Sequence, residues 1–307
     1  LAVAMPQGFS FDLAIFDEAH KTASRQATNY SFALQNKNLA IKKRLFLTAT
    51  PRHYNVHKKD KEGDQRIVYS MDDQDVYGRI AHQLSFRKAV SKGLICDYKV
   101  IISIITSEMV NRELLKRSDM VVGGDEIKAV RIANILAMQN ALKEYDIKRV
   151  FSFHNSMESA KTFAARSNEG IGAYLEDFTT LHVNGGMSTS KRESLLKEFK
   201  ESSKAIMTNA RCLTEGVDVP AVDMVAFVCP KKSKVDIIQA AGRAMRKADG
   251  KKVGYIFIPL FVQEAEGETI EEALKKTDFD TVWDVLQAIQ EHDEVLADII
   301  SQMREEK

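Results

Sequence analysis

Two adjacent carboxylates, Asp17 and Glu18, stand directly after a short apolar run in this chain and are followed closely by His20. The run Leu13–Phe16 is bounded by polar residues, a pattern typical of a buried strand in an α/β sheet, and ligands of such sheets bind just beyond the carboxyl ends of the strands. The carboxylates are therefore predicted at the mouth of a sheet, where they would suit Mg²⁺. Alone the pattern is weak, because any surface strand can end in Asp-Glu.

A second apolar run, Arg44–Leu47, ends in Thr48, Ala49 and Thr50 before Pro51 stops regular structure. Small hydroxyl residues at a strand end can hydrogen-bond to a carboxylate or histidine of the neighbouring strand. We therefore expect this segment to reach the acidic one, with a helix between the two strands. A plain strand and turn is the alternative.

Two arginines, Arg243 and Arg246, follow Gln239 in the segment Gln-Ala-Ala-Gly-Arg-Ala-Met-Arg. Residues three apart share a face of a helical turn, so both guanidinium groups are predicted on one side. Such a pair offers many donors to an anion. On an exposed helix, however, paired arginines are usually ordinary solvated surface.

Another strand, Lys204–Met207, leads into the segment Thr208–Pro220, where Gly216, Asp218 and Pro220 predict a turn. A strand followed by a turn accounts for residues 216–220. It does not account for the longer segment.

Length and composition indicate a protein of about two domains, since the chain has 307 residues and is 44% apolar. The three cysteines are far apart and suggest neither disulfides nor a zinc site. Without a long apolar run or a signal-peptide pattern, we expect no membrane association and a cytoplasmic location.

The net charge of +1 is unevenly distributed along the chain. Residues 263–307 carry 14 acidic and 4 basic side chains, so residues 1–262 carry 40 basic against 29 acidic ones. A basic body fits a phosphate-backbone ligand, although proteins that bind no nucleic acid also show such an excess.

The alternation of apolar runs and helical periodicity predicts an α/β fold. Strands are expected at 98–105, 148–153, 179–183, 204–207, 222–228 and 253–258, and helices at 127–145, 157–166 and 192–199. Residues 107–126 are predicted to be a connection. The last 45 residues keep an apolar stripe typical of helices, with Asp280 as the expected N-cap and a break near His292.

The ordered motifs resemble those of superfamily 2 helicases and translocases. Asp17–His20 resembles motif II, Thr48–Thr50 motif III, Thr208–Pro220 motif V, and Gln239–Arg246 motif VI. A looser element of the second motor domain is matched in order by His182, Gly186, Met187, Arg192 and Phe199.

Three further segments are similar to a particular branch of this superfamily. They are Tyr69–Gly78, Leu84–Val90 and Gly93–Val100. Their sequences resemble those of helicase-associated-domain proteins and of the motors of Type I and Type ISP restriction enzymes.

The resemblance implies tandem RecA-like parallel-sheet domains, the first of them partial. Residues 1–97 would be the C-terminal part of the first domain, 98–262 the second domain, and 263–307 an acidic helical extension. ATP and Mg²⁺ are the implied cofactors, with ATP between the domains.

The resemblance also implies roles for individual residues. Asp17 would hold Mg²⁺, Glu18 would orient the attacking water, and Arg243 and Arg246 would reach the γ-phosphate. Nucleotide binding is implied for His20, Gln239, Gly216 and Asp218. Nucleic-acid binding or coupling is implied for Thr48, Ala49, Thr50, Thr208, Asn209, His182 and Arg192.

The function implied is that of an ATP-dependent DNA helicase or translocase. DNA is preferred because residues 215–218 and 239–246 resemble the restriction and repair branch, which disfavours an RNA helicase. The sequence contains no P-loop of the form G-x-x-x-x-G-K-[ST]. We therefore expect a truncated chain that is inactive as an ATPase alone.

Two alternatives stay open. The chain could be a non-catalytic nucleic-acid-binding remnant, or the motor arm of a restriction nuclease with nuclease or methyltransferase modules elsewhere. Neighbouring sequence would discriminate between them.

Overall fold

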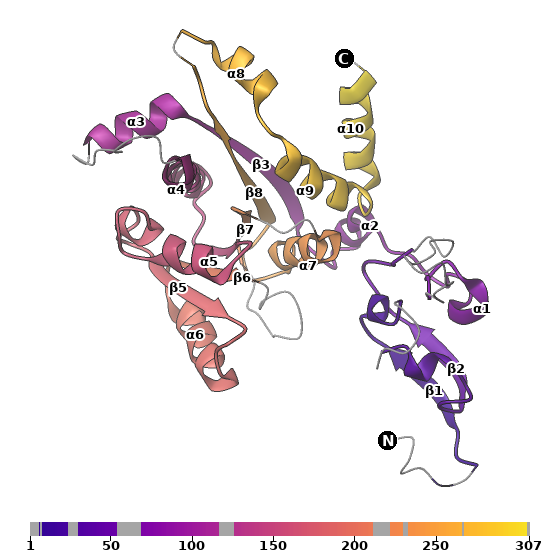
Figure 1. Cartoon of the computed structure of the whole chain (residues 1–307). Helices are drawn as coiled ribbons and strands as arrows, with labels where there is room; N and C mark the ends of the chain where they lie inside the picture. The colour runs from indigo at the N-terminus through magenta and orange to yellow at the C-terminus, as the bar shows by residue number, and fades with distance from the viewer. Residues whose placement is uncertain are drawn as a thin grey trace, which may run out of the picture. The chain divides into compact units, whose positions relative to one another are not determined.

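Parallel strands organise both units into which the chain divides, Leu1–Gln83 and Leu84–Lys307 (Figure 1). The computed structural model describes residues 6, 8–23, 30–53, 69–116, 126–210, 222–229, 233–265 and 267–305. The predicted α/β class is confirmed, with a larger and a smaller parallel sheet and a helical C-terminal part, consistent with a RecA-like fold.

The first unit contains a two-stranded sheet. Strand β1 (Phe11–Phe16) pairs in parallel with β2 (Ile41–Phe46). The described residues between them form two short 3-10 helices, Ala19–Lys21 and Phe32–Leu34, and residues 24–29 of the segment predicted as helix lie outside the described residues. A short helix, α1 (Gln74–Tyr77), follows.

One face of this small sheet is exposed. Leu13 and Ile15 are 52% and 60% exposed, and Leu45 and Leu47 are also exposed. The prediction of a buried strand was therefore wrong for these side chains. The physical reason is that the described residues of this unit pack only against the face of the sheet that carries Phe16.

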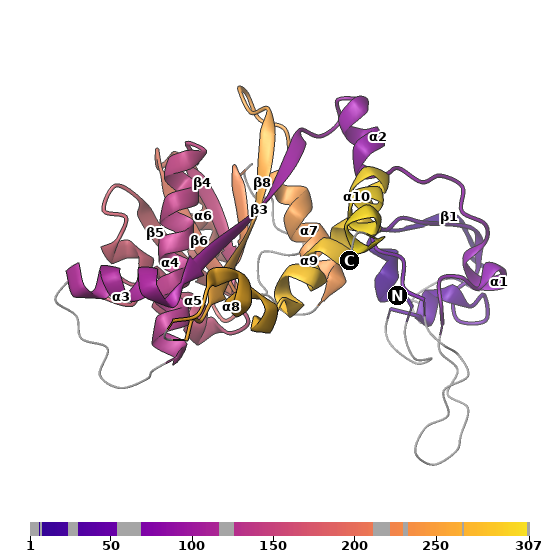
Figure 2. The same ribbon diagram turned by 90° about the horizontal axis from the view of Figure 1, so that it is seen from above.

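The second unit is built on a six-stranded parallel sheet with strand order β3-β8-β7-β4-β6-β5 (Figures 1 and 2). Its elements in chain order are α2 (Phe86–Ser91), β3 (Asp97–Thr106), α3 (Ser107–Lys116), α4 (Glu126–Glu144), β4 (Arg149–Phe153), α5 (Met157–Ala164), a 3-10 helix (Ile171–Ala173), β5 (Thr179–Asn184), α6 (Thr189–Glu201), β6 (Ala205–Ala210), β7 (Met224–Phe227), α7 (Lys234–Ala244), β8 (Val253–Val262), α8 (Ile270–Lys276), α9 (Asp280–Gln290) and α10 (Glu294–Glu305).

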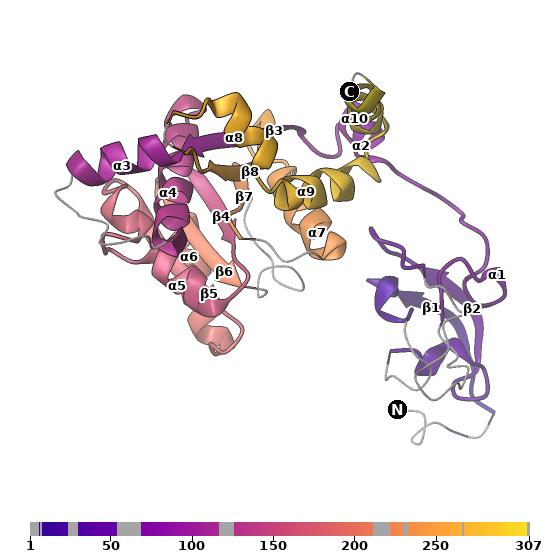
Figure 3. The same ribbon diagram turned by 45° about the horizontal axis from the view of Figure 1, so that its top comes forward.

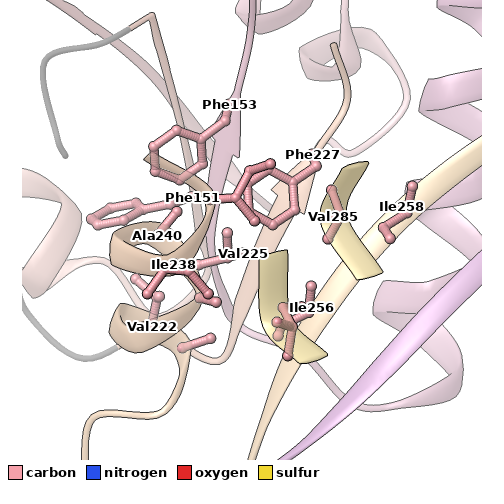
Figure 4. Packing of buried hydrophobic residues seen from close by; sticks show 14 of the residues in the cluster. Phe151, Phe153, Val222, Val225, Phe227, Ile238, Ala240, Ile256, Ile258 and Val285 are labelled. Atoms are coloured by element: carbon pink, nitrogen blue, oxygen red, sulfur yellow. The ribbon is translucent and has the colours of Figure 1, made fainter. Parts of the chain in front are cut away.

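Helices cover both faces of this sheet. Helices α6, α7 and α9 pack on one face, and α3, α4 and α5 pack on the other (Figure 3). Because successive strand residues point to opposite faces, Phe151 joins the first core and its neighbour Val150 the second. Figure 4 shows the first core, where Phe151, Phe227 and Val285 gather from β4, β7 and α9.

Two local expectations are corrected by the structure. Residues 107–116, predicted as a connection, form α3, because Val110 and Leu114 bury one face of that helix. Phe279, rather than Asp280, is the N-cap of α9, and Asp280 is the first helical residue. The predicted break near His292 is confirmed between α9 and α10.

The segment that enters the second sheet belongs to the second unit. Helix α2 precedes β3, and its Phe86 N–H donates to the carbonyl oxygen of His292 at 2.8 Å. The units divide between Gln83 and Leu84, while β3 begins at Asp97. The predicted domain limits at 97 and 262 stay predictions.

The helices in the described ranges are all too short or too polar to cross a bilayer.

Candidate functional site

The turn after β1 places Asp17 and Glu18 at the carboxyl end of the strand, as predicted. Glu18 adopts φ 50° and ψ 45°, a left-handed conformation that costs a non-glycine residue about 1–2 kcal/mol. The turn is held by Asp17 Oδ1, which accepts from Glu18 N–H at 2.9 Å, and by Ala19 N–H, which donates to the Leu47 carbonyl at 2.9 Å. Strain of this kind gathers at functional sites.

His20 connects this turn to the neighbouring strand end. The ring is 1% exposed, and its Nδ1 lies 3.1 Å from Thr48 Oγ1 and 3.3 Å from Glu18 Oε2. A carboxylate can only accept, so the proton belongs on Nδ1. The contact predicted between the hydroxyl segment and the acidic segment is thereby confirmed, while the functional roles of these residues stay predictions.

The other two residues of the hydroxyl segment differ in burial. Thr50 is buried, and its Oγ1 has no hydrogen-bond partner within the described residues. Its N–H donates to Thr48 Oγ1 at 3.1 Å. Ala49 is exposed. Thr50 thus keeps hydrogen-bonding capacity next to the His20 contact.

Tyr77 supports this region, and sequence reasoning assigned it no role. Its hydroxyl lies 3.0 Å from Thr22 Oγ1, and its ring is 4.9 Å from that of Phe46, which stacks on Phe16. The signal was present, because Tyr77 lies within Tyr69–Gly78. The similarity of that segment did not indicate which residue packs under the acidic turn.

In the second unit, a directional chain of hydrogen bonds runs across the ends of β5 and β6. Gly186 N–H donates to Asn184 Oδ1 at 3.0 Å, so Asn184 Nδ2 faces His182 Nε2, 3.2 Å away. Nε2 is then the acceptor, and Nδ1 donates to Thr208 Oγ1 at 3.1 Å. Thr208 in turn donates to the Ala160 carbonyl at 2.8 Å. The chain requires a neutral His182.

The charge states of two histidines agree with this arrangement. Burial and the nearby Lys161 lower the pKa of His182. His154, which follows β4, is buried between Ser152 Oγ at 2.8 Å and Ser159 Oγ at 3.4 Å. Burial and the neighbouring His182 lower the pKa of His154 to about 3. Both rings are therefore neutral near pH 7.

A cavity of about 300 Å³ opens beside His154. It is lined by Val130, Arg131, Asn134, His154, Ser159, Phe163, Val228 and Cys229. None of these was predicted as a site residue, and Arg131 is already paired with Glu169. The cavity is thus separate from the predicted motif residues.

The remaining predicted residues of this unit are buried to different degrees. Asn209 is fully buried in β6, where its Nδ2 donates to the Ser152 carbonyl at 3.1 Å, and its Oδ1 has no partner within the described residues. Arg192 on α6 is half-buried, and its buried Nε likewise lacks a partner there. Gly216 and Asp218 lie outside the described residues.

Of the predicted arginine pair, Arg243 lies on the last turn of α7 and Arg246 follows the helix. Arg243 is only 6% exposed, and its Nε and Nη1 have no hydrogen-bond partner within the described residues. Burial and the nearby charge of Arg246 lower the pKa of Arg243 to about 10. Arg246 lies just past the helix and is exposed, and Gln239, one turn before Arg243, is half-buried.

The state of Arg243 is unusual and indicates chemistry. Buried polar groups in folded proteins nearly always have partners, and a buried cation without a counter-charge is costly. A guanidinium with unpaired donors is suited to binding an anion. The fold is an α/β unit consistent with a RecA-like fold, and the end of α7 carries a guanidinium group that is chemically suited to an anion.

Comparisons with known proteins show similarity to helicases. Residues 131–248 match the helicase conserved C-terminal domain. The probable helicase A859L of African swine fever virus is 28% identical over 257 residues, which cover 82% of this chain and 26% of the viral protein. The chain therefore spans about a quarter of the length of the curated relatives it matches.

Solved structures agree. The ATP-dependent Type ISP restriction-modification enzyme LlaBIII bound to DNA is similar with a TM-score of 0.73 and 30% identity, covering 94% of this chain and 21% of that one. A nuclease-deletion mutant of the Type ISP enzyme LlaGI, in complex with a DNA substrate mimic, is similar with a TM-score of 0.60 and 26% identity, covering 99% of this chain and 19% of that one. The predicted resemblance to helicases and to the motors of restriction enzymes is confirmed.

Proposed function

We propose that this chain is the motor fragment of an ATP-dependent DNA helicase or translocase, in which ATP hydrolysis drives movement along nucleic acid. The observation that carries the proposal is Arg243, a buried guanidinium with two nitrogens unpaired within the described residues and Arg246 nearby. Helicase relatives support the class, and the arginine supports the anion chemistry. Because the chain spans about a quarter of those relatives, ATP turnover is proposed for the whole protein.

In this proposal Arg243 and Arg246 bind the γ-phosphate of ATP. An arginine that stabilises the charge of a transferring phosphoryl group is worth about 10³–10⁵ in rate in GTPases. Gln239 lies on the same helix and is assigned to the nucleotide. Gly216 and Asp218 share that assignment by resemblance.

Asp17 is proposed to hold Mg²⁺, and the residues present fit that ion. Mg²⁺ keeps several waters and needs only one or two protein carboxylates besides substrate phosphates. Asp17 is exposed at the end of β1. Groups of three or more His, Cys, Asp or Glu that could hold a metal are absent from the described residues, and a Mg²⁺ shared with ATP requires no such group. Glu18 is assigned to orient the attacking water.

Nucleic acid is the proposed partner. The residues assigned to nucleic-acid binding or coupling are Thr48, Ala49 and Thr50 in the first unit, and His182, Arg192, Thr208 and Asn209 in the second. Thr208 and Asn209 are fully buried, so their proposed part is coupling and not direct contact. The similarity to two DNA-bound restriction-enzyme structures favours DNA over RNA. The excess of basic side chains in residues 1–262 also favours a nucleic-acid partner.

One alternative is a nucleic-acid-binding remnant without ATP turnover. The similarity to Type ISP enzymes instead fits the motor arm of a restriction enzyme, with nuclease or methyltransferase modules outside these residues.

ATP turnover by the whole protein, with and without nucleic acid, tests the proposal. Single- and double-stranded DNA and RNA of matched sequence serve as activators. We expect DNA to stimulate turnover and Arg243→Ala to abolish that stimulation. Arg112→Ala, which removes an exposed arginine of α3 paired only with Glu108 among the recorded ion pairs, is the matched control.

The outcomes separate the alternatives. If the whole protein hydrolyses no ATP with any nucleic acid, the nucleic-acid-binding remnant is favoured over the motor. Stronger stimulation by RNA ends the DNA assignment. Binding measured at increasing salt should weaken steeply if phosphates are the contacts, because each neutralised phosphate releases a counterion.

A further inference from the structure

Lys251 lies in the turn between α7 and β8, and sequence reasoning gave it no role. Its Nζ donates to three main-chain carbonyls, those of Val222 at 2.6 Å, Arg246 at 3.1 Å and Ala244. An ammonium group has three N–H donors, so these carbonyls use all of them. Burial lowers the pKa of Lys251 from its ordinary value, as expected for a cation withdrawn from water.

Two of these carbonyls belong to the end of α7. The last carbonyls of a helix have no partner within the helix, and the negative end of the helix dipole favours a cation there. Lys251 meets both needs at Ala244 and at Arg246, just past the helix. The backbone of Arg246, and hence the origin of its side chain, is held by this ammonium.

The third carbonyl comes from a different part of the chain. Val222 stands between the segment Thr208–Pro220 and β7 (Met224–Phe227). One ammonium therefore ties the chain that leaves the motif V-like segment to the end of the motif VI-like helix. The chain next to one segment that we assign to the nucleotide, and the end of the other, are thus held by one ammonium group.

The segment that enters β3 docks on the same helix end. Cys96 N–H donates to the Met245 carbonyl at 2.9 Å, and Cys96 Sγ lies 3.7 Å from the Ala244 carbonyl oxygen. Burial raises the pKa of the Cys96 thiol, which keeps it protonated as a donor. Gly254 at the start of β8 allows the close approach, because a Cβ there would lie 2.0 Å from the Ala244 oxygen.

We propose that Lys251 is a positioning residue that fixes Arg246 relative to the chain leaving the motif V-like segment, and that ATP turnover depends on this tie. The inference rests on the proposed function, since it gives Arg246 its task. Lys251 touches no substrate in this scheme. It acts through the backbone of Arg246 and Val222.

The test compares Lys251→Met with Lys252→Met in the whole protein. Lys252 is the adjacent, exposed lysine and has no hydrogen bond or ion pair within the part of the chain that the structure describes, so it is a matched control. We expect Lys251→Met to lower kcat for nucleic-acid-stimulated ATP turnover roughly tenfold to a hundredfold with KM for ATP nearly unchanged, because small misplacements of a reacting group cost up to about that much. Lys252→Met should resemble the wild type.

Hydrogen exchange in the same variants measures the tie without any need for ATP. Lys251→Met should speed exchange in peptides covering residues 94–98 and 242–251, and Lys252→Met should not. Lys251→Arg keeps the charge, but its planar donors cannot surround three carbonyls equally well, so an intermediate kcat is expected. If Lys251→Met does not fold, the arginine variant decides the question.

Each outcome has one meaning. Faster exchange with normal turnover overturns the positioning role and leaves a structural lysine. Unchanged exchange in Lys251→Met overturns the tie itself. A wild-type protein without ATP turnover overturns the proposed function, and with it the task given to Arg246, while exchange still shows whether the tie exists.

Discussion

The two units carry the same side-chain pair in opposite electrostatic surroundings. In each, a histidine Nδ1 lies 3.1 Å from a threonine Oγ1: His20 with Thr48, just past β2, and His182 with Thr208, within β6. His20 has the Glu18 carboxylate 3.3 Å away. His182 has Lys161 near enough to lower its pKa.

This difference indicates how one pair can serve two kinds of ligand. Beside an acidic turn, the pair in the first unit lies next to groups suited to Mg²⁺ and water. Beside a lysine, the pair in the second unit lies in a setting suited to a phosphate. The hydrogen bond restrains the side chains in both units, so the charged neighbour is the difference between the two pairs.

Removing the acidic neighbour in the first unit should have the largest effect. In the whole protein, Glu18→Gln keeps the shape of the side chain but loses the charge near His20 and the assigned water-orienting group. We expect kcat for ATP turnover to fall at least about a hundredfold, the usual scale for loss of a general acid–base group. Nucleotide binding, measured by fluorescent ATP-analogue titration, should be retained.

Asp12→Asn is the control for that measurement. Asp12 lies on the same strand, is exposed, and pairs with Lys42 at 2.7 Å. Its variant should keep full turnover. Normal turnover in Glu18→Gln would remove Glu18 from its assigned role, and equal losses in both variants would point to general damage to the first unit.

Acid should weaken the second unit through its neutral histidines. The pKa of His154 is about 3 in the folded protein against an ordinary value of 6.5, so the unfolded chain binds more protons between these values. Stability is then fully present above pH 6.5 and falls as pH drops, by about 1.4 kcal/mol per pH unit. From pH 6.5 to 5 we expect a loss of about 2 kcal/mol from His154.

Urea unfolding of the chain followed by Trp283 fluorescence measures this loss. Trp283 is the single tryptophan in the sequence and lies on α9, so it reports the second unit. His154→Gln should flatten the decline between pH 6.5 and 5. His82→Gln, at an exposed histidine, should leave it unchanged. A decline equally steep in His154→Gln would show that other groups cause it.

Strand positions in the second unit could be predicted because local pattern and burial agree there. Strand β6 is buried at every residue, and its first half, Ala205–Met207, appears in the sequence as a continuous apolar run. Helix α3 was missed because only Val110 and Leu114 are buried within a charged segment. Sequence pattern could not show that Leu13 and Ile15 are exposed, since exposure depends on what covers the sheet.

Motif residues could be named from the sequence, but their connections could not. The contact of His20 with Thr48 was anticipated from strand ends that lie side by side. The hydrogen bonds of Lys251 to Val222, and of Tyr98 to the buried Asp293 at 2.8 Å, join residues far apart in the chain with no shared motif. Such contacts are set by tertiary packing, which no local periodicity records.

Removing the threonine of each pair should give the smallest effects and separate the two units by kind. Thr208→Val removes the acceptor of His182 Nδ1–H and the donor to the Ala160 carbonyl in a fully buried place. We expect the free energy of unfolding reported by Trp283 to fall by roughly 1–2 kcal/mol. Thr48 is only half-buried, so Thr48→Val should cost less than about 1 kcal/mol, measured by thermal melting.

The effects of the two threonine variants on activity should be in the opposite order to their effects on stability. Thr48→Val in the whole protein should reduce the stimulation of ATP turnover by DNA, because Thr48 joins His20 of the acidic turn to the hydroxyl segment assigned to coupling. The serine variants Thr48→Ser and Thr208→Ser keep the hydroxyl group and should restore coupling and stability respectively. If Thr48→Val cost as much stability as Thr208→Val and left stimulation intact, the two pairs would be equivalent structural links, and the acidic and basic neighbours would not distinguish the units.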